Sequence, residues 1–363
     1  MTQISLEKLR KEYGRLTAVN DLTLKIQDKT LVSLLGPSGC GKTTTLKMIA
    51  GLLRPTSGTI YFDDKDVTAL SPRDRRIGLV FQDYAIFTHM TAYKNIAYGL
   101  RIRRLSDTEA RKEVTDIAKL LHISEILDKM PGRMTQRELQ TVALARTLVT
   151  KPSILLLDEP LSNLDAAFRV RMRAELRTLQ MEIEQTLVYV THDQIEAMAM
   201  SDKVAVLNRG VLQQYGTPDE IYKRPQSKFV AGFIGMPPMN FIECTFVQKG
   251  DKAYLDQGSF RVDVSHLKSI IEEGATGPEM ILGIRPEDIT THERPPTRDA
   301  IEVSVESYDP MGSESIVYAK LGNHLIRLLA SGTFAAEPNE KRHIAFSVDA
   351  IHVIDKKTDK CIV

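Results

Sequence analysis

Residues 36–44 read GPSGCGKTT and contain the spacing G-x-x-x-x-G-K-T, which constrains the fold more than any other segment of the chain. A short apolar run at 31–35 precedes them, as expected for a buried strand. A segment of helical composition at 45–51 follows and ends at a glycine. In a strand–loop–helix context, glycines let the backbone N–H groups at a helix N-terminus surround phosphate groups. The segment therefore predicts a nucleoside triphosphate site.

The side chains of this loop have expected roles in such a site. Lys42 is expected to reach the β- and γ-phosphate oxygens, and the Thr43 hydroxyl to ligate Mg²⁺. The alternative is a glycine-rich turn with no ligand, which the strand–loop–helix context disfavours. The candidate nucleotide-binding residues of the loop are Gly36, Pro37, Ser38, Gly39, Cys40, Gly41, Lys42, Thr43 and Thr44.

Composition narrows the classes of protein that this chain can belong to. Its 363 residues are enough for two or three domains. The 48 basic and 47 acidic residues leave a net charge of +1, which argues against nucleic acid as the main partner. No apolar run approaches the roughly 20 residues that span a bilayer, and the N-terminus does not resemble a signal peptide. The three cysteines lack metal or disulfide spacing. We therefore expect a reduced, cytoplasmic protein whose membrane role, if any, requires a partner.

The chain divides into two halves that differ in their patterns of apolar and polar residues. In residues 1–235, apolar runs at 77–81, 154–157, 186–190 and 203–207 alternate with helical stretches, which predicts an α/β fold with a mostly parallel sheet covered on both faces. The first sixty residues are expected to be more antiparallel, with a turn at 56–59. A helical subdomain is predicted at about 83–150, where Ser106 and Ser124 are plausible helix starts.

Residues 236–363 have short alternating strand patterns with frequent turn signals. This half comes after a linker rich in Gly and Pro, and its short strand patterns predict a small all-β barrel or sandwich. Arg285, flanked by Pro286, is expected to be an exposed turn anchor. We see no convincing catalytic group in this half, and we expect it to be an accessory domain.

Residues 154–159 read ILLLDE and give the second strong signal. Four apolar residues form a buried strand that places two carboxylates at its C-terminal end, where open α/β sheets bind ligands. Asp158 is expected to hold Mg²⁺, and Glu159 to orient or polarise a water near the γ-phosphate. A strand that merely ends in an acidic turn is the alternative, which the neighbouring phosphate loop disfavours.

In this order, the motifs between residues 13 and 192 resemble those of ATP-binding-cassette (ABC) ATPases. The resemblance implies that Tyr13 stacks on adenine and that Gln82 touches Mg²⁺ or its water. It also implies that the loop 162–165 with Asp165 crosses a dimer interface and that His192 contacts the γ-phosphate. The implied catalytic residues are Glu159, His192, Lys42 and Gln82, and the implied Mg²⁺ ligands are Thr43, Gln82 and Asp158.

The second half narrows the resemblance to carbohydrate-uptake ABC importers of the maltose type. The segments 229–235, 239–241 and 283–288 resemble the junction and the OB-like (TOBE) accessory domain of that family. The resemblance implies ATP and Mg²⁺ as cofactors. It also implies two membrane permease subunits as partners, with a docking surface that includes residues 83–90, and an extracytoplasmic solute-binding protein as an indirect partner. The expected location is peripheral, on the cytoplasmic face of the cell membrane.

The signature of this family, Leu-Ser-Gly-Gly-Gln, is altered here. Counting back from residues 142–146 places it at Met134, Thr135, Gln136, Arg137 and Glu138, so both glycines are absent. Glycine allows a backbone to approach a ligand closely, so the side chains at 136 and 137 would obstruct that approach. Thr135 and Glu138 instead form a capping-box pattern that starts a helix.

Three interpretations of this change remain open. Arg137 supplies positive charge to a phosphate, or the loop adjusts with nothing lost, or the subunit pairs with a different ATPase subunit whose signature is intact. We favour the third, because a homodimer would carry the altered signature at both sites. Outside transport ATPases, a regulatory subunit that binds ATP with little turnover, and a soluble ABC protein acting on ribosomes or DNA, are the competing classes.

Overall fold

The computed structural model describes residues 2–162, 164–296 and 300–363, and the chain forms two compact units, Met1–Pro218 and Asp219–Val363. Each unit has its own hydrophobic core. Across the described residues, none of the helices is long and apolar enough to cross a membrane. All three cysteines are free.

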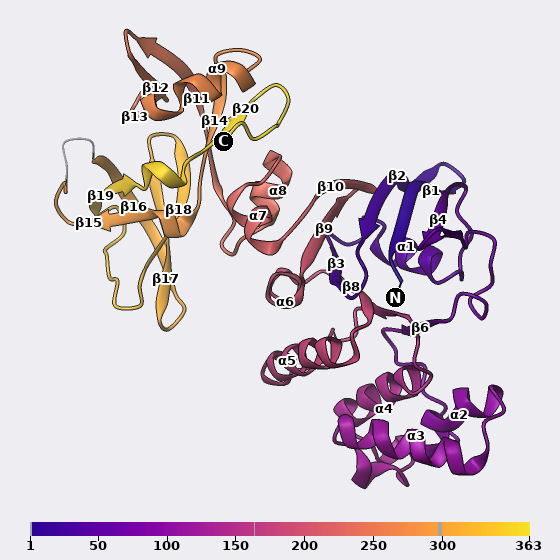
Figure 1. Ribbon diagram of the computed structural model, residues 1–363. Helices are drawn as coiled ribbons and strands as arrows, with labels where there is room; N and C mark the ends of the chain where they lie inside the picture. Colours follow the sequence, from indigo (N-terminus) through magenta and orange to yellow (C-terminus); the bar gives the residue numbers. More distant parts are fainter. Residues whose placement is uncertain (1, 163, 297–299) are drawn as a thin grey trace. The chain divides into compact units, whose positions relative to one another are not determined.

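A mostly parallel sheet forms the centre of the first unit (Figure 1). Its strand order is β10-β9-β3-β8-β7-β6, in which β10 runs antiparallel to β9 and the other pairs are parallel. The strands β3, β7 and β8 are buried along their whole length, which explains their continuous apolar sequences. The bounds are β3 Leu31–Leu35, β6 Ile77–Val80, β7 Ile154–Asp158, β8 Thr186–Thr191, β9 Lys203–Asn208 and β10 Val211–Gly216. The four predicted apolar strands are therefore confirmed.

A second, antiparallel sheet has the order β2-β1-β4-β5, as expected for the first sixty residues. Its strands are β1 Ile4–Tyr13, β2 Leu16–Ile26, β4 Ser57–Phe62 and β5 Lys65–Asp66. The turn predicted at 56–59 is wrong, because Ser57 and Gly58 already belong to β4. The register with β1 shifts between Glu7 and Arg10, and Gly58 has φ +86° there. A Cβ atom at Gly58 would lie 2.4 Å from the carbonyl oxygen of Lys8, so this glycine serves a bulge inside a strand.

The predicted helical subdomain is present. It contains α2 Ala92–Ile102, α3 Asp107–Leu120 and α4 Gln136–Leu148, with 3₁₀ turns at Ser124–Ile126 and Pro131–Arg133. Ser106 caps α3 through a complete capping box, as expected. Ser124 begins only a 3₁₀ turn, and Ile123 occupies the cap position there. Apolar residues of α2, α3 and α4 pack together in a common core.

The remaining helices of the first unit are α1 Lys42–Ile49, α5 Ala166–Ile183 and α6 Gln194–Met200. Leu46, Met48 and Ile49 of α1 pack into the core that the two sheets share. Met172, Leu176 and Leu179 of α5 pack with buried residues of β3, β7, β8 and α4. The two cores fix the loops at the carboxyl ends of the parallel strands.

The second unit is built mainly from two antiparallel sheets, with the orders β13-β12-β11-β14-β20 and β15-β19-β16-β17-β18. One core is shared between them, which agrees with the predicted small all-β domain. Its strands are β11 Asn240–Lys249, β12 Lys252–Asp256, β13 Arg261–Asp263, β14 Glu279–Ile284, β15 Ile289–His292, β16 Ile301–Pro310, β17 Glu314–Leu321, β18 His324–Ser331, β19 Lys341–Phe346 and β20 His352–Asp355. Its helices are α7 Pro218–Lys223, α8 Lys228–Phe233 and α9 Lys268–Gly274.

The division between the units lies at 218/219, earlier than the sequence-based boundary at 235/236. From Asp219 onward, α7 and α8 belong to the second unit, because Arg285 of the β-domain forms hydrogen bonds to both helical segments. Arg285 donates from Nη2 to the carbonyl oxygen of Tyr222 and from Nη1 to that of Ile234, both at 2.6 Å. Its guanidinium lies 3.8 Å from the centroid of the Tyr222 ring. Arg285 is therefore an anchor, as expected, but it is 3% exposed and not on the surface.

Candidate functional site

The loop between β3 and α1 has the shape of an anion cradle. Close approach of other backbone requires two of its glycines: a Cβ at Gly36 would lie 2.2 Å from the Leu207 carbonyl oxygen, and one at Gly41 2.4 Å from that of Ala18. Lys42 is buried, and its Nζ donates to the carbonyl oxygens of Gly36 at 2.7 Å and Pro37 at 3.0 Å. A helix N-terminus, close-packed backbone and a buried ammonium group together fit phosphate.

A hydroxyl and a carboxylate meet beside this loop. Thr43 Oγ1 donates to Asp158 Oδ1 at 2.9 Å, across 115 residues of sequence. Burial raises the pKa of the Asp158 carboxyl, while the Thr43 hydrogen bond and the charges of Lys47 and Lys42 oppose this rise. Oxygen ligands from a hydroxyl and a carboxylate are the type that Mg²⁺ prefers, so this pair fits the metal that accompanies a nucleotide.

Glu159 and His192 form a second pair next to the first. His192 Nδ1 lies 3.1 Å from Glu159 Oε2. Glu159 adopts φ +45°, an uncommon conformation for a residue with a side chain. Its backbone N–H donates to the Val190 carbonyl oxygen at 3.0 Å, and its own carbonyl accepts from Ser162 Oγ at 2.9 Å. These bonds hold the strained turn, a feature that clusters at functional sites.

Gln82 follows β6, the edge neighbour of β7. Its Nε2 donates to Ser162 Oγ at 3.5 Å, so it lies beside the turn that carries Glu159. Ser162 thus contacts both Glu159 and Gln82, a link that the sequence did not indicate. The adjacent Asn163 of the predicted interface loop lies outside the described residues.

A charged network next to His192 was not evident from the sequence. Arg169 of α5 donates from Nη2 to the Leu164 carbonyl oxygen at 3.1 Å, and its Nη1 lies 3.4 Å from Asp193 Oδ2. Its Nε lies 3.9 Å from Oε1 of the buried Glu196, whose Oε2 accepts from Thr191 Oγ1 at 2.7 Å. Arg169 therefore joins the interface loop to the turn that carries His192. An arginine four residues after the cap residue Asp165 could have suggested a group facing back toward that loop.

Other predicted site residues lie apart from these two pairs. Tyr13 stands at the end of β1 with half of its surface exposed, and Lys11 Nζ lies 5.3 Å above its ring. Thr135 and Glu138 form the predicted capping box at the start of α4, with Glu138 also paired to Lys129 at 2.7 Å. Asp165 caps α5 by accepting from the Phe168 N–H at 2.9 Å.

The topology explains why distant motifs converge. The sheet places β3, β8 and β7 side by side and parallel, so the segments after them meet at the same edge. Lys42 and Thr43 follow β3, Asp158 ends β7 and Glu159 follows it, and His192 follows β8. Open α/β sheets bind ligands at the carboxyl edge of their strands. A phosphate cradle, an oxygen pair suited to Mg²⁺ and a carboxylate–imidazole pair here share that edge, and together they can bind and cleave a nucleoside triphosphate.

Comparison with known families agrees with this geometry. Residues 19–162 match the ABC transporter family, residues 235–289 the MalK OB fold domain and residues 282–354 the TOBE domain. The chain is 43% identical over 378 residues to the trehalose/maltose import ATP-binding protein MalK of Thermococcus litoralis, which covers all of both chains. It is 39% identical to the sulfoquinovosyl glycerol transport ATP-binding protein SmoE of Agrobacterium fabrum, again over the full length of both. It is also 39% identical to the sn-glycerol-3-phosphate import ATP-binding protein UgpC of Ruegeria pomeroyi, over 100% of this chain and 99% of that one.

Solved structures resemble the first unit. CbiO1 from Clostridium perfringens aligns with a TM-score of 0.56 and 29% identity, covering 60% of this chain and 89% of its own. The ATP-binding cassette MJ0796, solved as a dimer bound to ADP and phosphate, aligns with a TM-score of 0.54 and 28% identity, covering 59% of this chain and 98% of its own. Given these similarities and a full-length relative at 43% identity, the chain belongs to the ABC transporter family, as an import ATPase subunit with a C-terminal MalK-type OB and TOBE domain.

Proposed function

We propose that this chain hydrolyses Mg²⁺-ATP at the carboxyl edge of β3, β8 and β7 and thereby energises import of a sugar, a polyol, glycerol or glycerol phosphate. The observation that carries the proposal is the convergence of two pairs, Thr43 with Asp158 and Glu159 with His192, beside the phosphate loop. The printed functions of the relatives, which include trehalose/maltose and sn-glycerol-3-phosphate import, support the class of solute.

Each residue has a role that its position supports. Lys42 and the loop N–H groups bind phosphate oxygens, and Thr43, Asp158 and Gln82 hold Mg²⁺ directly or through water. The metal supplies charge neutralisation at the phosphates. Glu159 orients the attacking water, and His192 holds the γ-phosphate while it contacts the Glu159 carboxylate. Phosphoryl transfer depends mainly on positioning and charge, so this small set is sufficient. Tyr13, exposed at the end of β1, provides a stacking surface for adenine.

The partners follow from the family. We propose two membrane permease subunits, contacted through residues 83–90, and an extracytoplasmic solute-binding protein that delivers the solute to them. We propose that the subunit attaches peripherally to these permeases, at the cytoplasmic face of the membrane. Solute is recognised by the permease and the binding protein, so this chain can serve related solutes.

The altered signature supports a second part of the proposal, pairing with an unlike ATPase subunit. Gln136 and Arg137 replace two glycines at the start of α4, where backbone would have to approach a nucleotide held by the opposite subunit. Losing one well-placed donor to a transition state costs about a hundred- to thousandfold in rate. A heterodimer limits this loss to one of its two sites, whereas a homodimer suffers it at both.

Light scattering on Glu159→Gln protein, with and without Mg²⁺-ATP, tests this pairing. The variant binds ATP but hydrolyses it slowly, so a homodimerising subunit should accumulate as a closed dimer. We expect the protein to stay monomeric while it still binds ATP. The double variant Lys42→Ala/Glu159→Gln, which has lost the phosphate ligand, is the matched control for any ATP-dependent change. An ATP-dependent dimer of the Glu159→Gln protein alone would show that the altered signature tolerates nucleotide and would overturn the heterodimer.

A further inference from the structure

Arg137 is engaged by its own subunit. It lies in the first turn of α4, and its guanidinium carbon stands 5.1 Å from the centroid of the Phe168 ring on α5. Its Nη2 also lies 3.8 Å from Oε1 of Glu175, two turns further along α5. A cation over an aromatic face and a carboxylate on the same helix are both attractive to a guanidinium. One side chain thus spans from α4 to two residues of α5.

The Phe168 ring in this contact is held in place by packing against the core. Its ring is partly buried and packs against the core formed by α4, α5 and the parallel strands, as does Leu139 from the same turn of α4 as Arg137. Its N–H is held by Asp165, the cap residue at the end of the interface loop. Arg137 therefore covers the solvent side of a ring whose position is tied to that loop.

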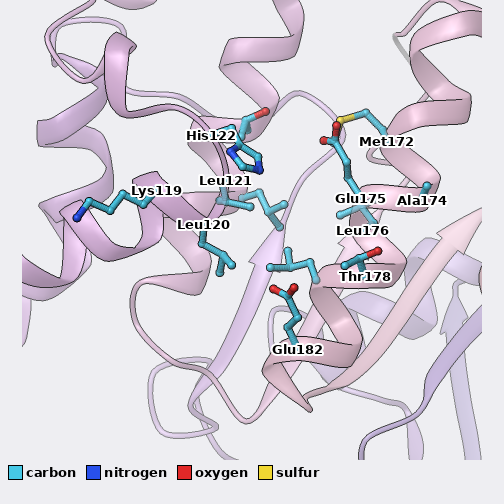
Figure 2. Close-up of a pocket in the computed structure, with 13 residues that line it drawn as sticks. Lys119, Leu120, Leu121, His122, Met172, Ala174, Glu175, Leu176, Thr178 and Glu182 are labelled. Atoms are coloured by element: carbon cyan, nitrogen blue, oxygen red, sulfur yellow. The ribbon is translucent and has the colours of Figure 1, made fainter.

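A pocket lies next to Glu175. Its volume is about 460 Å³, and it is lined by residues of α5, by residues 119–122 and by Thr141 and Leu144 of α4. In Figure 2, Leu120 and His122 lie opposite the α5 side chains Glu175 and Glu182 across this space, and Lys119 points away from them. The contacts of Arg137 with Phe168 and Glu175 therefore add to the apolar packing that already joins α4 and α5.

We propose that Arg137 is a positioning residue that holds the first turn of α4 against α5 within its own subunit, and not a ligand for the phosphate of a nucleotide bound by the partner. The inference rests on the proposed function only in assigning residues 135–138 to a nucleotide-facing segment. It explains how a segment without the two glycines keeps a fixed place beside the interface loop. The inference argues against the first interpretation of the altered signature, because the guanidinium contacts Phe168 and Glu175 of its own subunit.

The strength of the connection can be bounded. The cation–π contact and the ion pair are about half exposed, where each contributes only a small factor. Together they shift the equilibrium between held and released α4 by roughly three- to tenfold. That range is large enough to detect in a distance distribution and small enough for the variants to remain folded.

The experiment measures the separation of α5 and the first turn of α4 by electron spin resonance between labels at Gln136→Cys and Arg171→Cys, in the full chain with Cys361→Ser. We expect both variants to broaden the distribution, Arg137→Ala more than Glu175→Ala because it also removes the contact with Phe168, and the double variant to be no broader than Arg137→Ala. The charge reversal Arg137→Glu/Glu175→Arg restores only the ion pair and should recover part of the narrowing, which a purely steric role for Arg137 would not produce. Arg133→Ala, on the exposed turn just before α4, is the matched control and should leave the distribution unchanged.

One result would overturn the inference: an unchanged distance distribution in Arg137→Ala, which would show that Arg137 does not hold the first turn of α4 against α5. The distance measurement needs neither hydrolysis nor a partner, so failure of the proposed function leaves it readable.

Discussion

At the residue scale, the proposed ATP hydrolysis depends on pairs of side chains that the sheet brings together. Thr43 with Asp158 and Glu159 with His192 each join segments from different strands. Glu159 also adopts a left-handed backbone conformation, held by the Val190 carbonyl and by Ser162. The site is therefore preorganised before nucleotide binds, which is the main requirement for electrostatic catalysis.

The substitution Glu159→Gln tests the hydrolytic role directly. Glutamine keeps the size of the side chain but loses the charge that orients and polarises water. We expect the ATP hydrolysis rate to fall at least a hundredfold, within the range for a lost general base, with ATP affinity changed less than threefold. Steady-state phosphate release and nucleotide binding measure the two quantities. Unchanged hydrolysis would instead favour the regulatory subunit that binds ATP with little turnover.

Restoring glycine tests the obstruction at the altered signature. In Gln136→Gly/Arg137→Gly, the backbone at the start of α4 can approach a nucleotide from the opposite subunit. We expect the ATPase activity of the isolated protein to rise about tenfold, a part of the loss attributed to a missing donor. Glu175→Ala is the control, because it breaks the Arg137 ion pair and leaves both bulky side chains in place. If the double glycine variant gains no activity, obstruction is the wrong explanation.

At the element scale, α4 connects the altered signature to residues 83–90, the segment proposed to contact the permease. Its first turn carries Arg137, and its last turn carries Arg146, which donates to the carbonyl oxygens of Ala85 at 2.7 Å and Tyr84 at 2.9 Å. Both acceptor residues have positive φ, and the Arg146 guanidinium also lies 5.1 Å from the Phe87 ring. The helix thus fixes a strained turn in the segment proposed to contact the permease.

Removing the hydrogen bonds from Arg146 to Tyr84 and Ala85, called here the Arg146 clamp, should destabilise the first unit. Arg146→Ala leaves two carbonyl oxygens without their charged donor, so we expect the free energy of unfolding to fall by about 2 kcal/mol. Arg146→Lys retains the charge but cannot donate to both carbonyl oxygens with the geometry of a guanidinium, so it should lower the free energy of unfolding by about half as much. Urea unfolding of the full chain measures both. A loss below about 0.5 kcal/mol in the alanine variant, typical of a surface position, would show that the clamp is unimportant.

At the scale of the whole molecule, the two units have separate hydrophobic cores, and we expect the stability of the second unit to depend on pH through one buried carboxylate. The second unit closes around Asp355, which is 1% exposed at the end of β20. Burial by itself raises the pKa of this carboxyl, but backbone and side-chain hydrogen bonds from Thr276 and Thr358 outweigh it and hold the pKa well below its usual range. Residues 276 and 358 are thereby tied to the last strand.

This arrangement predicts acid sensitivity of the second unit. Because the pKa of Asp355 is lower in the folded than in the unfolded state, the unfolded state binds more protons in acid. The contribution is complete above the unfolded pKa, near 4, and is lost as the pH falls further. Thermal unfolding between pH 7 and pH 3 should show this loss, and Asp355→Asn should be less stable at pH 7 with a flatter pH dependence. The exposed Asp349→Asn is the control, and an equal pH slope in both variants would contradict the assignment.

Much of the fold could be predicted because local signals and tertiary packing agree. The buried strands at β3, β7, β8 and β9 read as continuous apolar runs, and the capping boxes at Ser106 and Thr135 mark their helices. The turn predicted at 56–59 failed because Gly58 serves a bulge, and a bulge is defined by the partner strand. Arg285 was placed on the surface because its acceptors, Tyr222 and Ile234, are distant in sequence.

The sequence by itself determined the chemistry of the nucleotide site, because the spacing of the loop 36–44 and the carboxylates after β7 are local properties of the chain. The tertiary structure decided which of these groups meet. The 2.9 Å bond between Thr43 and Asp158 and the 3.1 Å contact between Glu159 and His192 follow from the strand order β3-β8-β7, which no local pattern encodes. The tertiary structure also placed the Arg137 guanidinium over the Phe168 ring and 3.8 Å from the Glu175 carboxylate. The orientation of a long side chain depends on the helix packed against it, and that neighbour is set by the fold.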